Sequence, residues 1–119
     1  MAQFDVDGTP DQTFGTAGKI EPDFIVSSGA YDAVLMPDGV IALVGHIGNE
    51  DFGISFVNPQ GGPILQQDSE ALRIDFQGGS DRAFAAALGP NNSVVLAGDA
   101  SDSGGSFDWG IARYIAPSL

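Results

Sequence analysis

The feature of this sequence that most limits its fold is an internal repeat. Residues 30–45 align without gaps to residues 83–98, and six of the 16 aligned positions are identical. Further along, residues 51–57 align to residues 108–114, after a loop that is four residues longer in the second copy. A period of about fifty-five residues is typical of propellers and repeat arrays, in which each repeat is one supersecondary unit. We therefore expect two copies of one structural unit.

Each copy reads as short β-strands separated by turns. The expected strands lie at residues 19–24, 30–36, 40–46 and 52–58, with counterparts that include residues 73–76 and 109–115. Pro37, Asp38 and Gly39 are expected to form a tight turn between two of them. Asp-Gly suits a type I′ turn, whose two central residues both need positive φ. No stretch keeps the apolar spacing of a long helix without meeting Gly or Pro.

Two apolar runs, at residues 41–44 and 94–97, do not alternate with polar residues. Strands of this kind are buried on both faces, as in blades that stack between neighbouring blades. Trp109 aligns with Phe52, so we expect it in the core rather than as a platform for a sugar ring. The favoured fold is all-β, with two β-propeller-type blades of about four antiparallel strands each. The alternative is a β-sandwich of two sheets packed face to face.

The pattern resembles the delta-60 repeat family of bacterial β-propeller-like domains. Residues 13–20 fit the opening of a blade in that family, residues 36–41 its middle and residues 108–114 its end. These motifs are structural glycines, turns and core positions, so they bear on fold and hardly on function. The resemblance implies a secreted or cell-surface bacterial protein. The first residues, Met1 to Asp5, lack the basic region and apolar core of a signal peptide.

The repeat divides the chain into three parts. Residues 1–18 resemble the last strand and turn of a preceding blade, residues 19–62 form the first blade and residues 63–119 the second. Two blades are too few to close a propeller, and arrays below about three units are usually unstable alone. We therefore expect the N-terminal strand of one subunit to complete the last blade of the next. Such a head-to-tail contact must close into a ring, here a homo-trimer or homo-tetramer.

Charge excludes some partners. The chain has 16 Asp and Glu residues against 4 Lys and Arg residues, for a net charge of −12. A surface of this kind repels phosphate groups, so neither nucleic acid nor an anionic membrane is an expected partner. No apolar run is long enough for a membrane-spanning helix. The absence of Cys removes thiolate metal sites and Cys nucleophiles.

A short acidic loop near the N-terminus is a candidate metal site. Asp5, Asp7 and Asp11 are spaced by two and four residues, with Gly8 at the bend between the last two. Hard cations such as Ca²⁺ take several oxygen ligands from short flexible loops, so these three carboxylates would be the ligands. The competing interpretation is that Asp7 and Gly8 form only the turn expected at this point of the repeat.

A second set of candidates lies in the two matching loops that follow the central strand of each copy. Loops at this position emerge on one rim of a propeller. The candidate ligand-binding residues are Asn49, Glu50, Asp51, Asp99 and Asp102. The competing interpretation is an acidic, solvated loop in each copy. His46, the single His, aligns with Asp99 and is expected to be a surface residue.

No motif assigns a catalytic residue. The sequence therefore favours a non-enzymatic β-propeller-type module, structural or ligand- and protein-binding, that acts as an oligomeric ring. The alternative is a glycoside-type hydrolase that uses acidic residues on the propeller face, with Ca²⁺ as the cofactor that would assist it.

Overall fold

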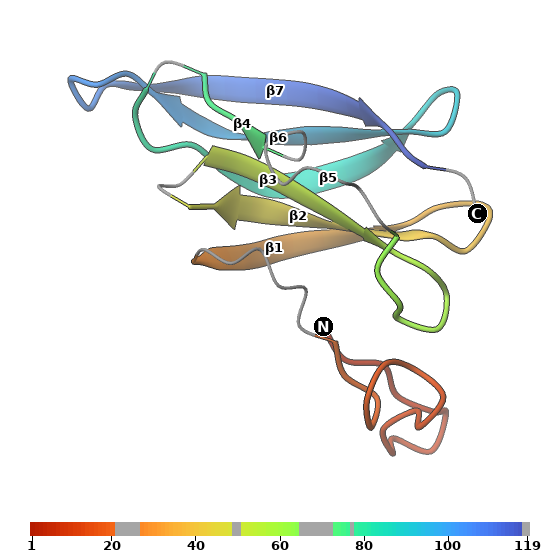
Figure 1. The fold of residues 1–119 in the computed structure, drawn as a ribbon. Helices are drawn as coiled ribbons and strands as arrows, with labels where there is room; N and C mark the ends of the chain where they lie inside the picture. The colour runs from red at the N-terminus through yellow and green to blue at the C-terminus, as the bar shows by residue number, and fades with distance from the viewer. Residues whose placement is uncertain (21–26, 49–50, 65–72, 77, 118–119) are drawn as a thin grey trace.

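The computed structural model describes residues 1–20, 27–48, 51–64, 73–76 and 78–117. Within these residues the chain forms strands β1 (Ser28–Leu35), β2 (Ile41–Ile47), β3 (Asp51–Val57), β4 (Arg73–Ile74), β5 (Arg82–Gly89), β6 (Ser93–Ser101) and β7 (Phe107–Ile115). The predicted all-β class is confirmed (Figure 1). In the described part of the chain, no helix has the length and apolar character needed to cross a membrane.

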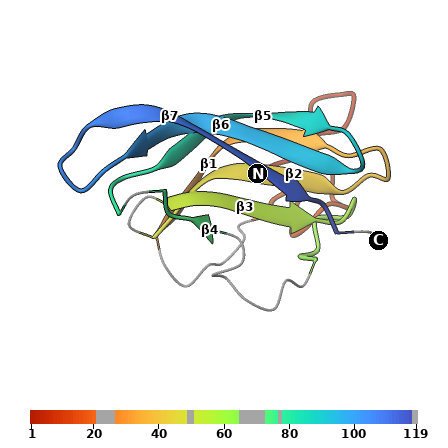
Figure 2. The ribbon, with the colours of Figure 1, turned by 90° about the horizontal axis from the view of Figure 1, so that it is seen from above.

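The strands form two open antiparallel sheets that pack face to face. The first sheet has the order β1-β2-β3-β4 and the second the order β5-β6-β7. Figure 1 shows them as two layers, with the N-terminal segment, residues 1–20, beneath the first. Seen from above in Figure 2, β5 and β6 lie in the upper part of the view and β3 and β4 in the lower part, with β7 crossing above β2. The chain by itself is thus a two-layer β structure.

Strand β4 joins the first sheet rather than the second. Ile74 pairs with Phe52 and Arg73 with Gly53, so β4 lies along the outer edge of β3. The sequence placed this strand in the second copy, within residues 63–119. Most of its expected counterpart at residues 19–24 lies outside the described residues.

The two units β1-β2-β3 and β5-β6-β7 pair in the same register. The pair Ala33 and Leu43 has its counterpart in Ala86 and Leu96. Likewise, Ile41 opposite Val57 corresponds to Val94 opposite Tyr114. Each unit also has a bulge at the same place in its first strand, after Ala30 and after Ala83.

The shared register shows that the two sheets stack in the same orientation. One core lies between them, formed by alternate residues of both. From the first sheet it takes Ala42, Val44, Phe52, Ile54 and Phe56, and from the second Val94, Leu96, Ala112 and Tyr114. The pair Val44 and Ile54, on the inner face of the first sheet, corresponds to Ala97 and Ile111 on the far face of the second. Unlike faces therefore meet between the layers.

The N-terminal segment covers part of the outer face of the first sheet. Phe14 is buried there with Ile41, Leu43 and Val57. The run at residues 41–44 is therefore buried on both faces, as its sequence predicts. The run at residues 94–97 is not, because no described segment lies on the outer face of the second sheet: Ala97 is exposed. Burial on both faces was thus predicted wrongly for the second run.

The turn between β1 and β2 also differs from the prediction. Met36 N–H donates to the carbonyl of Val40 at 2.7 Å, and Gly39 N–H donates to the carbonyl of Met36 at 3.0 Å. Gly39 has φ +92°, whereas Asp38 is not among the residues with positive φ. The predicted type I′ turn is therefore wrong. The turn that the Gly39–Met36 bond closes has Pro37 and Asp38 at its centre, and the fixed negative φ of Pro37 excludes type I′ there. Pro-Asp followed by a left-handed Gly makes a longer hairpin loop. In the second copy Asn91 and Asn92 have φ of +56° and +58°.

Candidate functional site

The outer face of the second sheet is the most distinctive surface of the molecule. We call it the open face. Alternate residues of three strands project from it: Ala85, Ala87, Val95, Ala97, Asp99, Phe107, Trp109, Ile111, Arg113 and Ile115. Trp109 is 92% exposed and Ile111 65% exposed. Phe107 and Ile115 are likewise 63% and 66% exposed, so no described segment covers this face.

Trp109 corrects the sequence prediction most directly. Its counterpart Phe52 is 0% exposed, because the second sheet covers the face on which Phe52 lies. Trp109 lies on the corresponding face of the second sheet, where the described chain provides no further layer. The prediction of a core position was therefore wrong for the single chain. Trp109 does occupy the position of a core residue in the repeat, but its burial requires a further sheet above it.

The open face lacks the acid excess of the rest of the molecule. Arg82 lies opposite Asp99 in the β5–β6 register, and Arg113 lies opposite Val95. One of the chain's 4 basic residues is thus on a face with one carboxylate, and a second, Arg82, lies next to that carboxylate, although the chain as a whole carries −12. The long-range repulsion that keeps acidic proteins apart is therefore weakest here.

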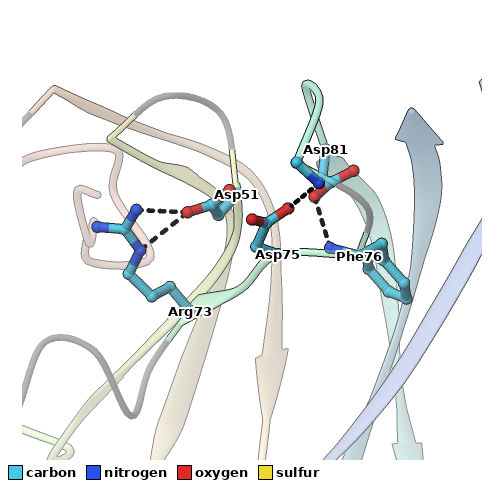
Figure 3. A network of polar contacts seen from close by, with 6 residues as sticks. Asp51, Arg73, Asp75, Phe76 and Asp81 are labelled. Carbon is cyan, nitrogen blue, oxygen red and sulfur yellow. Dashed lines mark hydrogen bonds and ion pairs between the residues drawn. The ribbon is translucent and has the colours of Figure 1, made fainter. Parts of the chain in front are cut away.

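A cluster of three carboxylates lies where the two sheets meet at one end. Asp51, Asp75 and Asp81 bring ligand oxygens within 4.8 Å of one another, the only such group among the described residues. Arg73 Nε donates to Asp51 Oδ2 at 2.9 Å, and its guanidinium forms an ion pair with the same oxygen. Figure 3 shows Arg73 and Asp51 on one side of the cluster and Asp81 on the other.

Asp81 joins segments that are distant in sequence. Its side chain is fully buried, at 0% exposed. Oδ2 accepts a hydrogen bond from Phe76 N–H at 3.0 Å, and Oδ1 accepts one from Ser101 N–H at 3.0 Å. Asp75 Oδ1 in turn accepts a bond from Gly78 N–H at 2.7 Å. Most of the oxygen ligands that a cation would use are thus engaged by the chain itself.

The sequence identified Asp51 but missed Asp75 and Asp81. Asp75 and Phe76 belong to a short motif that aligns with Asp23 and Phe24. That alignment marked a strand and gave no reason to expect a polar cluster. Asp81 has no acidic counterpart in the first copy, where Ser28 stands at the aligned position. Its role depends on a contact with Ser101, twenty residues away.

The N-terminal acidic loop forms local turns. Asp7 Oδ1 accepts hydrogen bonds from Thr9 N–H and from Thr9 Oγ1. Asp11 Oδ1 does the same with Thr13. These bonds hold the pKa of each carboxyl below its usual range, and the bond from the hydroxyl has a larger effect than the bond from the main chain. Asp5 closes the turn through its main chain, by bonds to Thr9 and Gly8.

The structure therefore does not bring Asp5, Asp7 and Asp11 together as a set of three ligands. Each of the two bonded carboxylates instead stabilises the turn that follows it. The same kind of turn occurs at Asn58, whose Oδ1 accepts bonds from Gln60 and Gly62 N–H. The geometry is that of the competing interpretation, a turn at this point of the repeat.

The other candidate residues lie in different environments. Asp99 is on the open face opposite Trp109. Asp102 closes the turn between β6 and β7, where its Oδ1 accepts hydrogen bonds from Gly104 and Ser106 N–H. Asp51 is in the acidic cluster and is itself buried. Asn49 and Glu50 lie outside the described residues.

A cavity of about 350 Å³ lies between the N-terminal segment and the first sheet. Met1 and Ile20 line one side, and His46 is on the other with its ring 5.8 Å from that of Tyr31. His46 is half-buried, which differs from the predicted surface position. The described lining residues include Ser28 and Ser55 but no carboxylate, so the acidic pair of a glycoside hydrolase is not assembled there.

No model of a known family, no curated protein and no solved structure matches the chain.

Proposed function

We propose that this protein is a non-enzymatic structural and binding module that works by stacking its open face against another β-sheet unit. One observation carries the proposal. The open face corresponds in register to the face with which the first sheet contacts the second, and it is exposed. The molecule contains one contact of this kind and presents the surface for another.

Energetics support the proposal. Complete burial of one large apolar side chain is worth about 1.5–3 kcal/mol. Covering Trp109 and Ile111, which are both largely exposed, would therefore supply a substantial part of a binding free energy. Contiguous exposed apolar patches on soluble proteins mark interaction surfaces more often than single exposed residues do.

Oligomerisation into a ring of three or four chains, as the two-blade repeat and the register of its ends predict, is one form that this function could take. It stays a prediction. A head-to-tail ring needs a second surface that accepts the open face, and its natural counterpart is the outer face of the first sheet. Residues 1–20 cover part of that face in the same chain, with Phe14 in the buried cluster.

An apolar dye tests whether the open face binds at all. Trp109 is the only Trp of the chain, so energy transfer from it to bound anilinonaphthalene sulfonate locates the dye. At high dilution we expect transfer in the wild type and its loss in Ile111→Ser, which leaves Trp109 in place as the donor. Val6→Ser, an exposed apolar substitution in the N-terminal segment, is the matched control. Dye binding that is equal in all three proteins would contradict the proposed function.

A further inference from the structure

We infer that the partner of the open face is the open face of a second copy, related by a two-fold axis. The inference rests on the proposed function and names its partner. A two-fold contact uses the same patch on both copies, so it closes at a dimer. It also needs no rearrangement of either chain, whereas a head-to-tail contact would require residues 1–20 to leave the first sheet.

Two copies of the open face can pair their side chains around a two-fold axis at Ile111. Trp109 and Arg113 lie two residues on either side of Ile111, on the same face of β7. A two-fold axis that lies in the interface and crosses β7 at Ile111 sets Trp109 of each copy over Arg113 of the other. A guanidinium over an indole ring is a favourable cation–π arrangement, and Arg is the residue that makes it most often.

Charge supports the same axis. Asp99 is the neighbour of Trp109 across β6 and β7, and Val95 is the neighbour of Arg113. The axis at Ile111 therefore brings Asp99 of one copy diagonally beside Arg113 of the other. An axis parallel to the strands would instead keep each residue at its own level along the sheet, so Arg113 would face Arg113, Val95 or Ala87 of the other copy and no carboxylate. The crossing axis thus pairs the charges of the open face.

The size of the face predicts a weak dimer. Strands lie about 4.8 Å apart and rise about 3.4 Å per residue, so three strands of this length give a face about 30 Å long and about 10–14 Å wide. Two such faces together have a flat area of roughly 600–840 Å², so the accessible surface that they bury is at most on the order of 1,000 Å², near the lower limit of specific interfaces. We therefore expect dissociation in the micromolar range.

Pairing of two copies along the edge of β7 is less favourable. This edge strand runs from Phe107 to Ile115 and could extend the sheet by hydrogen bonding to a second β7. Such an arrangement would leave Trp109, Ile111 and the rest of the open face in water. Face-to-face packing buries them and follows the aligned packing that the two sheets already use within one chain.

Light scattering on a sizing column, repeated over a range of concentrations, gives the mass, and the emission of Trp109 reports whether the open face is covered. We expect a concentration-dependent dimer with blue-shifted emission. Ile111→Ser should weaken the dimer at least about tenfold, as central interface residues do. Val6→Ser should leave it unchanged. Circular dichroism checks that each variant keeps its strands.

A charge exchange tests the axis itself. Arg113→Asp should weaken the dimer, since it removes the guanidinium over Trp109 and sets two carboxylates beside each other. The double variant Asp99→Arg with Arg113→Asp should recover the part of this loss that comes from charge repulsion and so dimerise more tightly than Arg113→Asp alone. A double variant that dimerises no more tightly than Arg113→Asp would overturn the two-fold geometry. A monomer at every concentration would overturn the second copy as partner, while the dye experiment at high dilution still decides the proposed function. A trimer or tetramer that Ile111→Ser disrupts would overturn the two-fold dimer and support the ring.

Discussion

The carboxylate of Asp32 in the first sheet accepts a hydrogen bond from the main-chain N–H of Ala86 in the second sheet, at 2.8 Å. β5 is an edge strand, so alternate N–H groups along it have no partner within their own sheet. Asp32 follows the bulge in β1 and supplies that partner from the layer below. The side chain thus ties the exposed edge of one sheet to the face of the other.

Removal of this contact should destabilise the fold. Asp32→Ala leaves the Ala86 N–H without its acceptor, and we expect a loss of about 1–2 kcal/mol in the free energy of unfolding. Asp32→Asn keeps an acceptor oxygen and should cost less. Urea unfolding followed by circular dichroism measures both. Equal stability of the two variants would show that the hydrogen bond contributes little.

Asp81 should be among the most sensitive polar positions. Both of its oxygens accept main-chain hydrogen bonds, and the residue is fully buried. Asp81→Asn turns one acceptor into a donor that faces another N–H group, so we expect a loss of roughly 1–3 kcal/mol. The matched control is Asp75→Asn, an exposed member of the same cluster. A larger effect of the control would contradict the assignment.

The acidic cluster provides a test of cation binding. The guanidinium of Arg73 neutralises the charge of Asp51. Arg73→Gln should therefore lower the free energy of unfolding by roughly 1–3 kcal/mol, less than for a fully buried pair because Arg73 is partly exposed. The carboxylates left without this charge offer oxygens to a hard cation. We therefore expect Ca²⁺ to raise the Tm of Arg73→Gln more than that of the wild type. An equal response of the two proteins would argue against a cation at this cluster.

The burial of Tyr114 should make the protein less stable at alkaline pH. Burial raises the pKa of Tyr114 to about 12, whereas an unfolded Tyr has a pKa of about 10. The contribution of Tyr114 to the free energy of unfolding is therefore fully present below about pH 10. It is lost as the pH rises from about 10 to about 12, because in this range the unfolded chain releases the proton and the folded chain keeps it. Tyr114→Phe should reduce this loss, which urea unfolding at a series of pH values measures.

The same substitution should not weaken the protein at neutral pH. The hydroxyl of Tyr114 is buried and has no hydrogen-bond partner among the described residues. Its replacement by hydrogen removes a desolvated polar group, so Tyr114→Phe should be as stable as the wild type or about 1 kcal/mol more stable. A clear loss of stability would indicate that the hydroxyl has a partner.

Local pattern predicted the strands well. Expected strands at residues 40–46 and 52–58 correspond to Ile41–Ile47 and Asp51–Val57, because apolar runs and turn residues are properties of short segments. The turn at Pro37 was mistaken although Pro itself limits φ, so that signal was present and was outweighed by the Asp-Gly pair.

Burial and the acidic cluster could not be predicted in the same way. Phe52 and Trp109 occupy aligned positions and differ in exposure from 0% to 92%, since only one of them has a sheet above it. Asp81 likewise depends on Ser101, which the sequence does not mark as a partner. These properties belong to contacts between distant segments rather than to the segments themselves.

Stacking of unlike faces gives the molecule polarity. One end of the stack is partly capped by residues 1–20, which bury Phe14 against the first sheet, while no described residue caps the other end. Growth by duplication of the unit would therefore proceed in one direction. A third unit copied from the second would carry Val94, Leu96 and Ala112 on the face that meets the uncapped end. The lengthening of such a protein requires no new kind of contact, only repetition of the one that it already contains.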